Sequence, residues 1–303
     1  MMAIGRAVLS EARGPCSSVR VRDPRLRRRQ AISGLMSGLV ALSTVIAVGA
    51  LLLVLGYVVV KGAPALNWAF FTERPLPFGE VGGGVGPALM GTVYMLAIAG
   101  VMGIPLGVGT GIYLAEYGRG RFASAVRFAI DLVAGLPSIV VGVFVWALLV
   151  RNVIGQYSAL AGAMALAIIM VPLVSRTVEE MLRLVPDSLR EAALALGIPR
   201  WKAILRVVVP TARAGVVTGV VLALARAGGE TAPLLLTALG NQFFSIDPLA
   251  PMASLPVQIY TYAMSPYEDW HAKAWGGALV LVAVLGAMSL LVRLVGKRQT
   301  PRS

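Results

Sequence analysis

Two ionisable residues four positions apart, Arg226 and Glu230, stand in an otherwise apolar stretch of the chain. An arginine guanidinium is a planar fork of donors that binds an oxyanion or a carboxylate through two parallel hydrogen bonds. Residues spaced i and i+4 share one face of a helix, so Glu230 is also placed to pair with Arg226. Two interpretations stay open. The residues form a local ion pair that only lowers the cost of burial, or Arg226 meets a passing anion and Glu230 is its counter-ion.

The elements that must position these residues are transmembrane helices. The chain has 303 residues, 57% of them hydrophobic and 14% charged, with a mean hydropathy of +0.80. A typical soluble chain is roughly 25% charged. Six segments are long enough to cross a hydrocarbon core of about 30 Å, at approximately 32–60, 87–115, 125–150, 157–177, 212–238 and 274–295. We predict an all-α polytopic membrane protein with about six spans.

Arg226 falls in the fifth span, roughly 22 Å from its start and past the bilayer centre at 1.5 Å per helical residue. An ionisable residue at that depth indicates function. Prolines inside the spans predict kinks, and glycines four residues apart predict close helix packing. The residues concerned are Pro105, Pro137, Pro172, the Gly103, Gly107 and Gly111 series, and the Gly215 and Gly219 pair.

The basic residues indicate the orientation. Twenty-two of the 27 lie in the N-terminal tail, in the loops after the second and fourth spans, and at the C-terminal end. Only four lie in the other three loops. By the positive-inside rule, both termini and the two basic loops are cytoplasmic. The net charge of +13 is therefore a topology signal, and nucleic-acid binding is disfavoured because no separate basic domain carries a base-reading element.

The spans and charges give a domain organisation. A basic tail over 1–30, which contains Cys16, is expected to be disordered. A first transmembrane helix (31–61), an external loop (62–86), a core of five helices (87–296) and a cytoplasmic tail (297–303) follow. The core contains a cytoplasmic loop at 178–210 and an external loop at 239–273.

Other ionisable and aromatic residues have simple interpretations. One cysteine and one histidine exclude a disulfide framework and a multi-histidine metal site, so no metal is expected. His271 is expected in solvent or at the membrane interface. Asp131 is expected to pair with Arg127. Arg176, close to Glu179 and Glu180, is expected to anchor the inner surface, and lining the inner mouth is the less favoured alternative. The residues expected in an outer aromatic belt are Trp68, Trp270, Trp275 and Tyr267.

The loop at 178–210 predicts a helical hairpin. Ser188 and Glu191 have capping-box spacing, so a helix is expected to begin at Ser188. Gly197 should end it, and Pro199 suits the first position of a second helix. The hairpin either connects two spans or is a docking element for a cytoplasmic partner.

This loop resembles a known family. Glu191-Ala192-Ala193, then Gly197, Ile204 and Pro210, is similar to the EAA loop of ABC importer permeases, although Val208-Val209 replaces the usual Leu before the proline. The resemblance implies the type I, MetI-like permease architecture, with the hairpin as a coupling helix on a separate ATPase. It implies that the ATPase-coupling residues are Glu191, Ala192, Ala193, Gly197 and Ile204.

Further stretches resemble one branch of that family, the PstA-type permease subunits of phosphate ABC importers. Leu224–Pro233 is similar to their Arg-x-x-Gly-Glu-Thr-Ala-Pro signature, with Gly228 where Ile is more frequent. Gly83–Pro87, Ala134–Val140 and Leu255–Tyr260 also match, and the resemblance covers roughly 80–295. It implies a location in the inner (plasma) membrane of the cell. It also implies that Arg226 and Glu230 lie on the translocation path of phosphate. The implied partners are a PstC-type permease, two copies of an ATP-binding subunit, an external phosphate-binding protein and membrane lipid.

The chain has no G-x-x-x-x-G-K-[ST] run, so ATP and Mg²⁺ are assigned to the partner and no cofactor to this chain. No nucleophile–base set is visible, and a transport subunit is favoured over a membrane enzyme. One alternative is a permease for another oxyanion, sulfate or molybdate. A less favoured alternative is an ion-gradient-driven secondary transporter, which would show internal repeats and would not need the hairpin.

Overall fold

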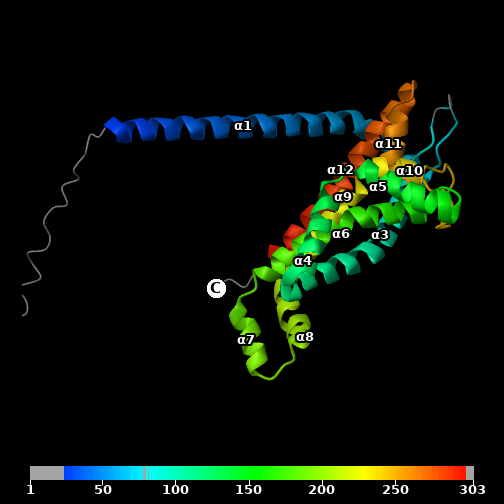
Figure 1. Cartoon of the computed structure of the whole chain (residues 1–303). Helices are drawn as coiled ribbons and strands as arrows, with labels where there is room; N and C mark the ends of the chain where they lie inside the picture. Colours follow the sequence, from blue (N-terminus) through cyan, green and yellow to red (C-terminus); the bar gives the residue numbers. More distant parts are fainter. Residues whose placement is uncertain (1–23, 78–79, 81, 298–303) are drawn as a thin grey trace, which may run out of the picture. The chain divides into compact units, whose positions relative to one another are not determined.

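The computed structural model describes residues 24–77, 80 and 82–297, and all regular elements in these residues are helical (Figure 1). The chain divides into two units, 1–56 and 57–303, which are treated separately. Helix α1 (Pro24–Gly62) accounts for the described part of the first unit and continues into the second. Residues 24–30, expected to be disordered, are therefore helical. The rest of the expected tail, including Cys16, lies outside the described residues.

Five helical stretches among the described residues are long and apolar enough to cross a membrane. The first is Arg28–Ala65, which ends in the short helix η1 (Ala63–Ala65). The other four are α3 (Gly86–Ile112) with its π-helical extension η2 (Tyr113–Tyr117), α6 (Ala159–Arg183), the continuous run of α8 (Arg200–Ala203), η4 (Ile204–Val208) and α9 (Val209–Gly228), and α12 (Glu268–Lys297). The expected helical membrane fold is confirmed.

The third expected span, 125–150, is broken in two. Helix α4 (Gly120–Gly135) meets α5 (Ser138–Val145), which continues as η3 (Trp146–Ile154), at an angle of 103°. The prediction of one helix over 125–150 with a kink was therefore wrong. The reason is Pro137: it disfavours a helical conformation at the preceding residue, and Leu136 has φ −72° and ψ 139°.

The fifth expected span also ends early. Helix α9 stops at Gly228, and a separate short helix, α10 (Ala232–Thr237), begins after a turn. The expectation of one helix over 212–238 was therefore wrong. Two consecutive glycines are poor helix formers, and Pro233 suits the first turn of a new helix. Arg226 consequently lies in the last turn of α9.

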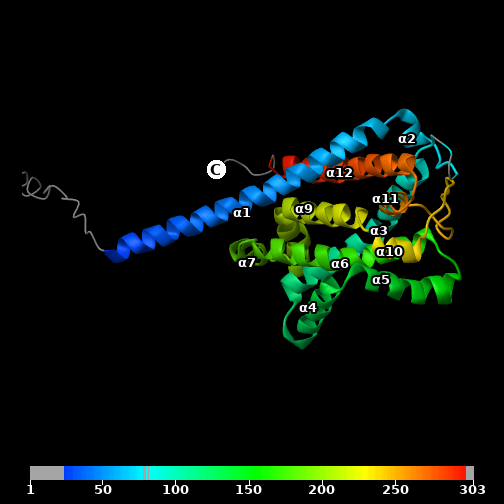
Figure 2. The same cartoon turned by 90° about the horizontal axis from the view of Figure 1, so that it is seen from above.

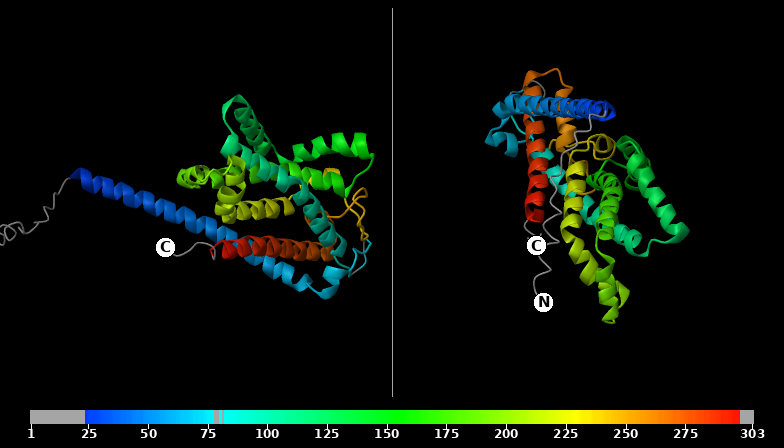
Figure 3. Two further views of the ribbon diagram at one scale, coloured as in Figure 1. Left: turned by 90° about the horizontal axis from the view of Figure 1, so that it is seen from below. Right: turned by 90° about the vertical axis from the view of Figure 1, so that its left-hand side faces the viewer.

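Helix α6 is the centre of the second unit and packs against α3, α4, α5, α9 and α10 (Figures 2 and 3). The glycines of α3 allow the closest approach. A Cβ added at Gly107 would lie 2.7 Å from Cβ of Val174, and one at Gly111 would lie 2.6 Å from Cβ of Val178. On the α9 side, a Cβ at Gly219 would lie 2.3 Å from a methyl group of Thr177. The predicted close packing at these glycines is confirmed.

A second apolar cluster joins α2 (Trp68–Thr72), the start of α3, α11 (Leu255–Ala263) and α12. Trp270 is buried here, with its ring centroid 4.6 Å from that of Tyr262, so its assignment to an aromatic belt was wrong. Trp68 is 82% exposed. The buried Lys273 forms a 2.7 Å ion pair with Asp269 and donates to the carbonyl of Gly82, which ties α12 to the loop before α3.

Candidate functional site

Arg226 and Glu230 line one cavity of about 270 Å³. Its walls come from the break between α4 and α5, from the middle of α6, and from the end of α9 with the turn that follows it. The lining residues are Val133, Ala134, Leu136, Pro137, Ser138, Val141, Ile169, Pro172, Leu173, Arg176, Arg226 and Glu230. The structure thus brings the two predicted path residues together and adds polar groups from two other helices.

Interruptions in the helices account for this location. The chain turns at Pro137, α9 ends at Gly228, and Pro172 lies inside α6. A proline inside a helix removes a hydrogen-bond donor, and a helix end leaves backbone groups without helical partners. In a membrane, such backbone is tolerated where it lines a polar cavity or is buried in protein. The same interruptions therefore make a polar cavity within apolar helices.

Arg226 is exposed and Glu230 is half-buried. None of the ion pairs formed by the described residues joins these two side chains or involves Arg226. Glu230 lies in the turn after α9, where its N–H donates to the carbonyl of Ala227. The i, i+4 geometry of a continuous helix therefore does not apply, and the expected local pair is not formed.

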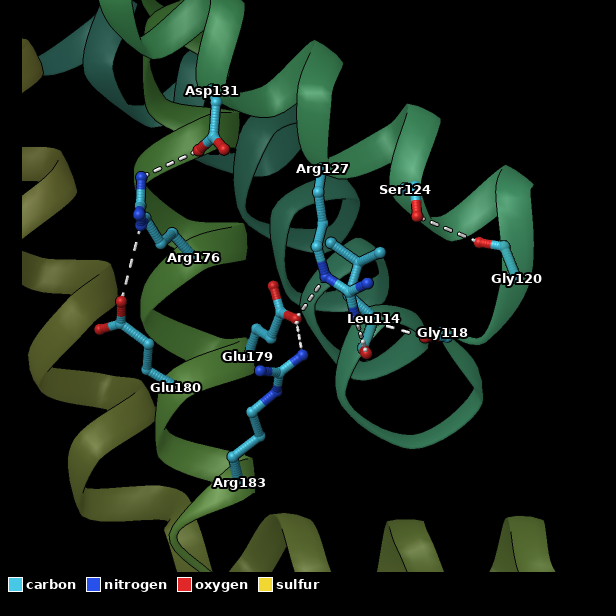
Figure 4. Close-up of polar contacts among 10 residues, drawn as sticks. All are labelled: Leu114, Gly118, Gly120, Ser124, Arg127, Asp131, Arg176, Glu179, Glu180 and Arg183. Atoms are coloured by element: carbon cyan, nitrogen blue, oxygen red, sulfur yellow. Dashed lines mark hydrogen bonds and ion pairs between the residues drawn. The ribbon is translucent and has the colours of Figure 1, made fainter.

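Arg176, for which lining the inner mouth was the less favoured interpretation, lines this cavity. It pairs with Asp131 of α4 at 2.9 Å and with Glu180 at 3.6 Å (Figure 4). The predicted pair of Arg127 with Asp131 was wrong. Arg127 instead pairs with Glu179 of α6 at 2.9 Å. Its guanidinium also donates to the carbonyls of Leu114 in η2 and Gly118 after it, and these bonds direct the side chain toward α6.

Charged side chains continue along α4 and α6 beyond the first cavity. Glu179 also accepts from Arg183 at 2.6 Å, so it is shared by two arginines (Figure 4). A second cavity of about 200 Å³ lies here, lined by Arg127, Ile130, Asp131, Arg176, Glu179, Glu180 and Arg183. Arg176 belongs to both cavities, so polar surface extends from Arg226 toward the end of α6.

The predicted hairpin is present at that end, with helix α7 (Asp187–Ala195) followed by α8. Gly197 has φ +74°. Its N–H donates to Leu194, and that of Ile198 to Ala193, which is the Schellman end of a helix. The expected start at Ser188 was wrong, since the helix begins at Asp187 after Pro186 without a side-chain cap.

The five residues of the EAA resemblance divide into two groups. Ala193 of α7 and Ile204 of η4 are buried, and these two elements of the hairpin pack against each other. Glu191, Ala192 and Gly197 are exposed. Large apolar side chains surround the exposed group, and clustered exposed apolar groups mark interaction surfaces. These are Leu194, Leu196, Trp201 and Leu205.

A buried carboxylate behind the hairpin was not found from the sequence. Glu116 of η2 is 7% exposed and forms an ion pair with Arg190 of α7 at 2.8 Å. The hydrogen bond to Glu116 raises the pKa of Arg190 above its usual value. The available signal was a glutamate at the end of an apolar span, but its partner is 74 residues away in the chain.

Comparison with known proteins assigns this architecture to a family of membrane transport proteins. Residues 107–302 match the family described as binding-protein-dependent transport system inner membrane component. The fold resembles a chain of the inward-facing MetNI methionine ABC transporter, with a TM-score of 0.58 at 20% identity, over 70% of this chain and 94% of that one. A bacterial ABC transporter for alginate import gives 0.62 at 13% identity, over 91% and 100%. The fold and the hairpin define a multi-pass inner membrane transport subunit of the ABC importer class.

More similar relatives narrow this class. The phosphate transport system permease protein PstA of Xylella fastidiosa is 49% identical over 240 residues, which is 77% of this chain and 83% of the relative. PstA of Haemophilus influenzae is 44% identical over 267 residues, or 88% and 94%. The chain belongs to the PstA family of phosphate transport permeases.

Proposed function

We propose that this chain is the permease subunit of an ATP-driven phosphate importer and that Arg226 and Glu230 lie on the path of the anion. Membership of the PstA family supports phosphate over sulfate or molybdate. The observation that carries the path assignment is the cavity, where Arg226 meets no described carboxylate within ion-pair distance. A guanidinium so placed has its donor fork available for an oxyanion.

Glu230 limits how tightly the path binds the anion. A carboxylate on the cavity wall repels a phosphate anion while Arg226 attracts it, so the two groups together favour a brief contact over tight capture. Tight capture is assigned to an external phosphate-binding protein. Arg176, in contrast, has Asp131 and Glu180 as partners, which supports an anion contact weaker than that of Arg226.

The partners and orientation follow from the hairpin and the charges. We assign the exposed hairpin face, with Glu191, Ala192 and Gly197, to a cleft on an ATP-binding subunit, present in two copies. A PstC-type permease would complete the path. The charge asymmetry supports cytoplasmic termini and a cytoplasmic hairpin. ATP and Mg²⁺ belong to the ATPase, and phosphate is the substrate.

Labelled-phosphate uptake tests the proposal in cells that lack the gene and are complemented with variants. Arg226→Gln should abolish uptake while the subunit still reaches the membrane and co-purifies with its ATPase. Arg213→Gln, on the same helix but outside the cavity, is the matched control and should restore uptake. Labelled sulfate is measured in parallel.

Each result has one meaning. Uptake restored by Arg226→Gln would remove Arg226 from the path and leave it a structural residue. Sulfate uptake with the wild-type chain would overturn the substrate assignment. Phosphate uptake that survives deletion of the ATPase would overturn the ATP-driven mechanism.

A further inference from the structure

The end of the second span is held by arginines from other helices. Helix ends leave their last carbonyls without helical donors. At the end of α3 and η2, the carbonyls of Leu114 and Gly118 accept from Arg127 of α4 at 2.9 and 3.4 Å. The carbonyl of Glu116 accepts from Arg200 of α8. The position of this helix end therefore depends on side chains of neighbouring elements.

The carboxylate of Glu116 is held most strongly. Its side chain is 4% exposed, and a buried charge requires a partner. Arg190 of α7 donates to it from Nη2 at 2.8 Å and from Nε at 3.1 Å. Arg190 also donates to the carbonyl of Leu182 in the last turn of α6 at 2.7 Å, to that of Val185 just beyond this helix at 2.6 Å, and to Asp187 at 3.0 Å.

Both arms of the hairpin thus meet on one residue. Arg190 lies on the arm before the turn at Gly197, and Arg200 opens the arm after it. Arg200 also stacks over the ring of Tyr117, 5.0 Å from its centroid. Glu116 accepts from the first arm with its carboxylate and from the second with its backbone carbonyl.

We propose that Glu116 is a positioning residue that carries displacement of the hairpin into the second span. The proposal rests on the proposed function, in which an ATPase moves the hairpin. One connection from the hairpin is covalent, because α8 continues through η4 into α9. The Glu116 contact is a second connection, to α3, which does not follow the hairpin in sequence. Because its glycines carry no side chains, α3 packs closely against α6. A displacement at the end of α3 is therefore transmitted to α6, which lines the cavity.

The two connections act on different faces of α6. Helix α9 contacts α6 at Thr177, and α3 contacts it at Val174 and Val178. With Glu116 in place, one movement of the hairpin displaces both neighbours of α6 together. Without the ion pair, α9 still follows the hairpin, but α3 is held to it only through Arg200 and follows less closely. ATP hydrolysis then continues while the cavity changes shape incompletely.

The test uses the complete transporter in proteoliposomes, with both permeases, the ATPase and the external phosphate-binding protein. The variant is Glu116→Gln, which keeps the shape and removes the charge. The measured quantity is phosphate transported per ATP hydrolysed, alongside recovery of the assembled complex. We expect normal assembly and continued hydrolysis, with transport per ATP lowered at least about fivefold, the lower end of a typical coupling effect.

Asp187→Asn is the matched control, because it removes the exposed partner of the same Arg190 and leaves the buried one. It should change the ratio by less than about twofold, as expected for an exposed pair. If Glu116→Gln does not assemble, Arg190→Lys is measured instead. It keeps a cation beside Glu116 but loses the fork, and the same lowered ratio is expected.

Proportional loss of transport and hydrolysis, or an unchanged ratio, would overturn the positioning role. Failure of the wild-type transporter to move phosphate would overturn the proposed function instead. The two failures are therefore distinguishable in one experiment.

Discussion

Replacement of Gly111 by alanine should weaken the packing of α3 on α6. The added Cβ would lie 2.6 Å from Cβ of Val178 and 2.7 Å from the carbonyl oxygen of Ser175, where ordinary contact is 3.4–4 Å. The helices must therefore separate locally by roughly 1 Å, and overpacking of this kind costs about 1–3 kcal/mol. Neither obstacle is the flexible end of a side chain, so the strain has no easy relief.

Gly109→Ala is the internal control for the same helix. No atom lies within 4 Å of its added Cβ, and the position is exposed. Alanine is favoured over glycine in a helix by about 1 kcal/mol at either position, so this term cancels when the variants are compared. The difference between them isolates the contact with α6 and should be about 1–3 kcal/mol in favour of Gly109→Ala.

The assay is unfolding of each purified variant in one detergent, followed by circular dichroism during a denaturant titration. Gly109→Ala should match or exceed wild type, and Gly111→Ala should unfold at a lower denaturant concentration. Equal midpoints for the two variants would refute the reasoning, because they would mean that α3 and α6 separate without cost.

Three further outcomes are expected. Gly197→Ala should weaken co-purification of the ATPase more than Gly197→Asn, because φ is +74° and a left-handed conformation costs an ordinary residue about 1–2 kcal/mol but asparagine less; equal effects would contradict this. Lys273→Met should speed proteolysis of the loop before α3, and adding Asp269→Asn should restore part of the protection by removing the stranded carboxylate; full protection in the single variant would count against the anchor. Gly142→Ala, whose Cβ would lie 2.7 Å from Cα of Pro233, should lower phosphate uptake without loss of the subunit from the membrane, because it forces α5 and α10 apart next to the cavity; unchanged uptake would show that this close contact is dispensable.

Composition and periodicity were sufficient for the membrane class and the hairpin. Apolar runs of span length depend only on local sequence, and so does the helix end at Gly197. The helix end at Gly228 was missed because continuous hydropathy over 212–238 concealed it. Hydropathy responds to polarity and not to backbone breaks, so the sharp corner at Pro137 was expected only as a kink.

The ion pairs show a second limit. Arg127 was assigned to Asp131 because the two are four residues apart, but it pairs with Glu179, which is 52 residues away. Local spacing identifies partners within one helix only. The Glu116 junction depends on tertiary contacts between distant segments, and a single sequence carries no record of those.

The uninterrupted course of α9 has a mechanical consequence. Its 20 residues extend about 30 Å from the hairpin end to the cavity at 1.5 Å per residue. A rotation of about 5° around the hairpin end would therefore sweep Arg226 through about 2–3 Å. A hydrogen bond is lost over a smaller change in distance, of less than about 1 Å. This helix is a lever arm, so a modest tilt at the hairpin is enough to engage or release an anion at its far end.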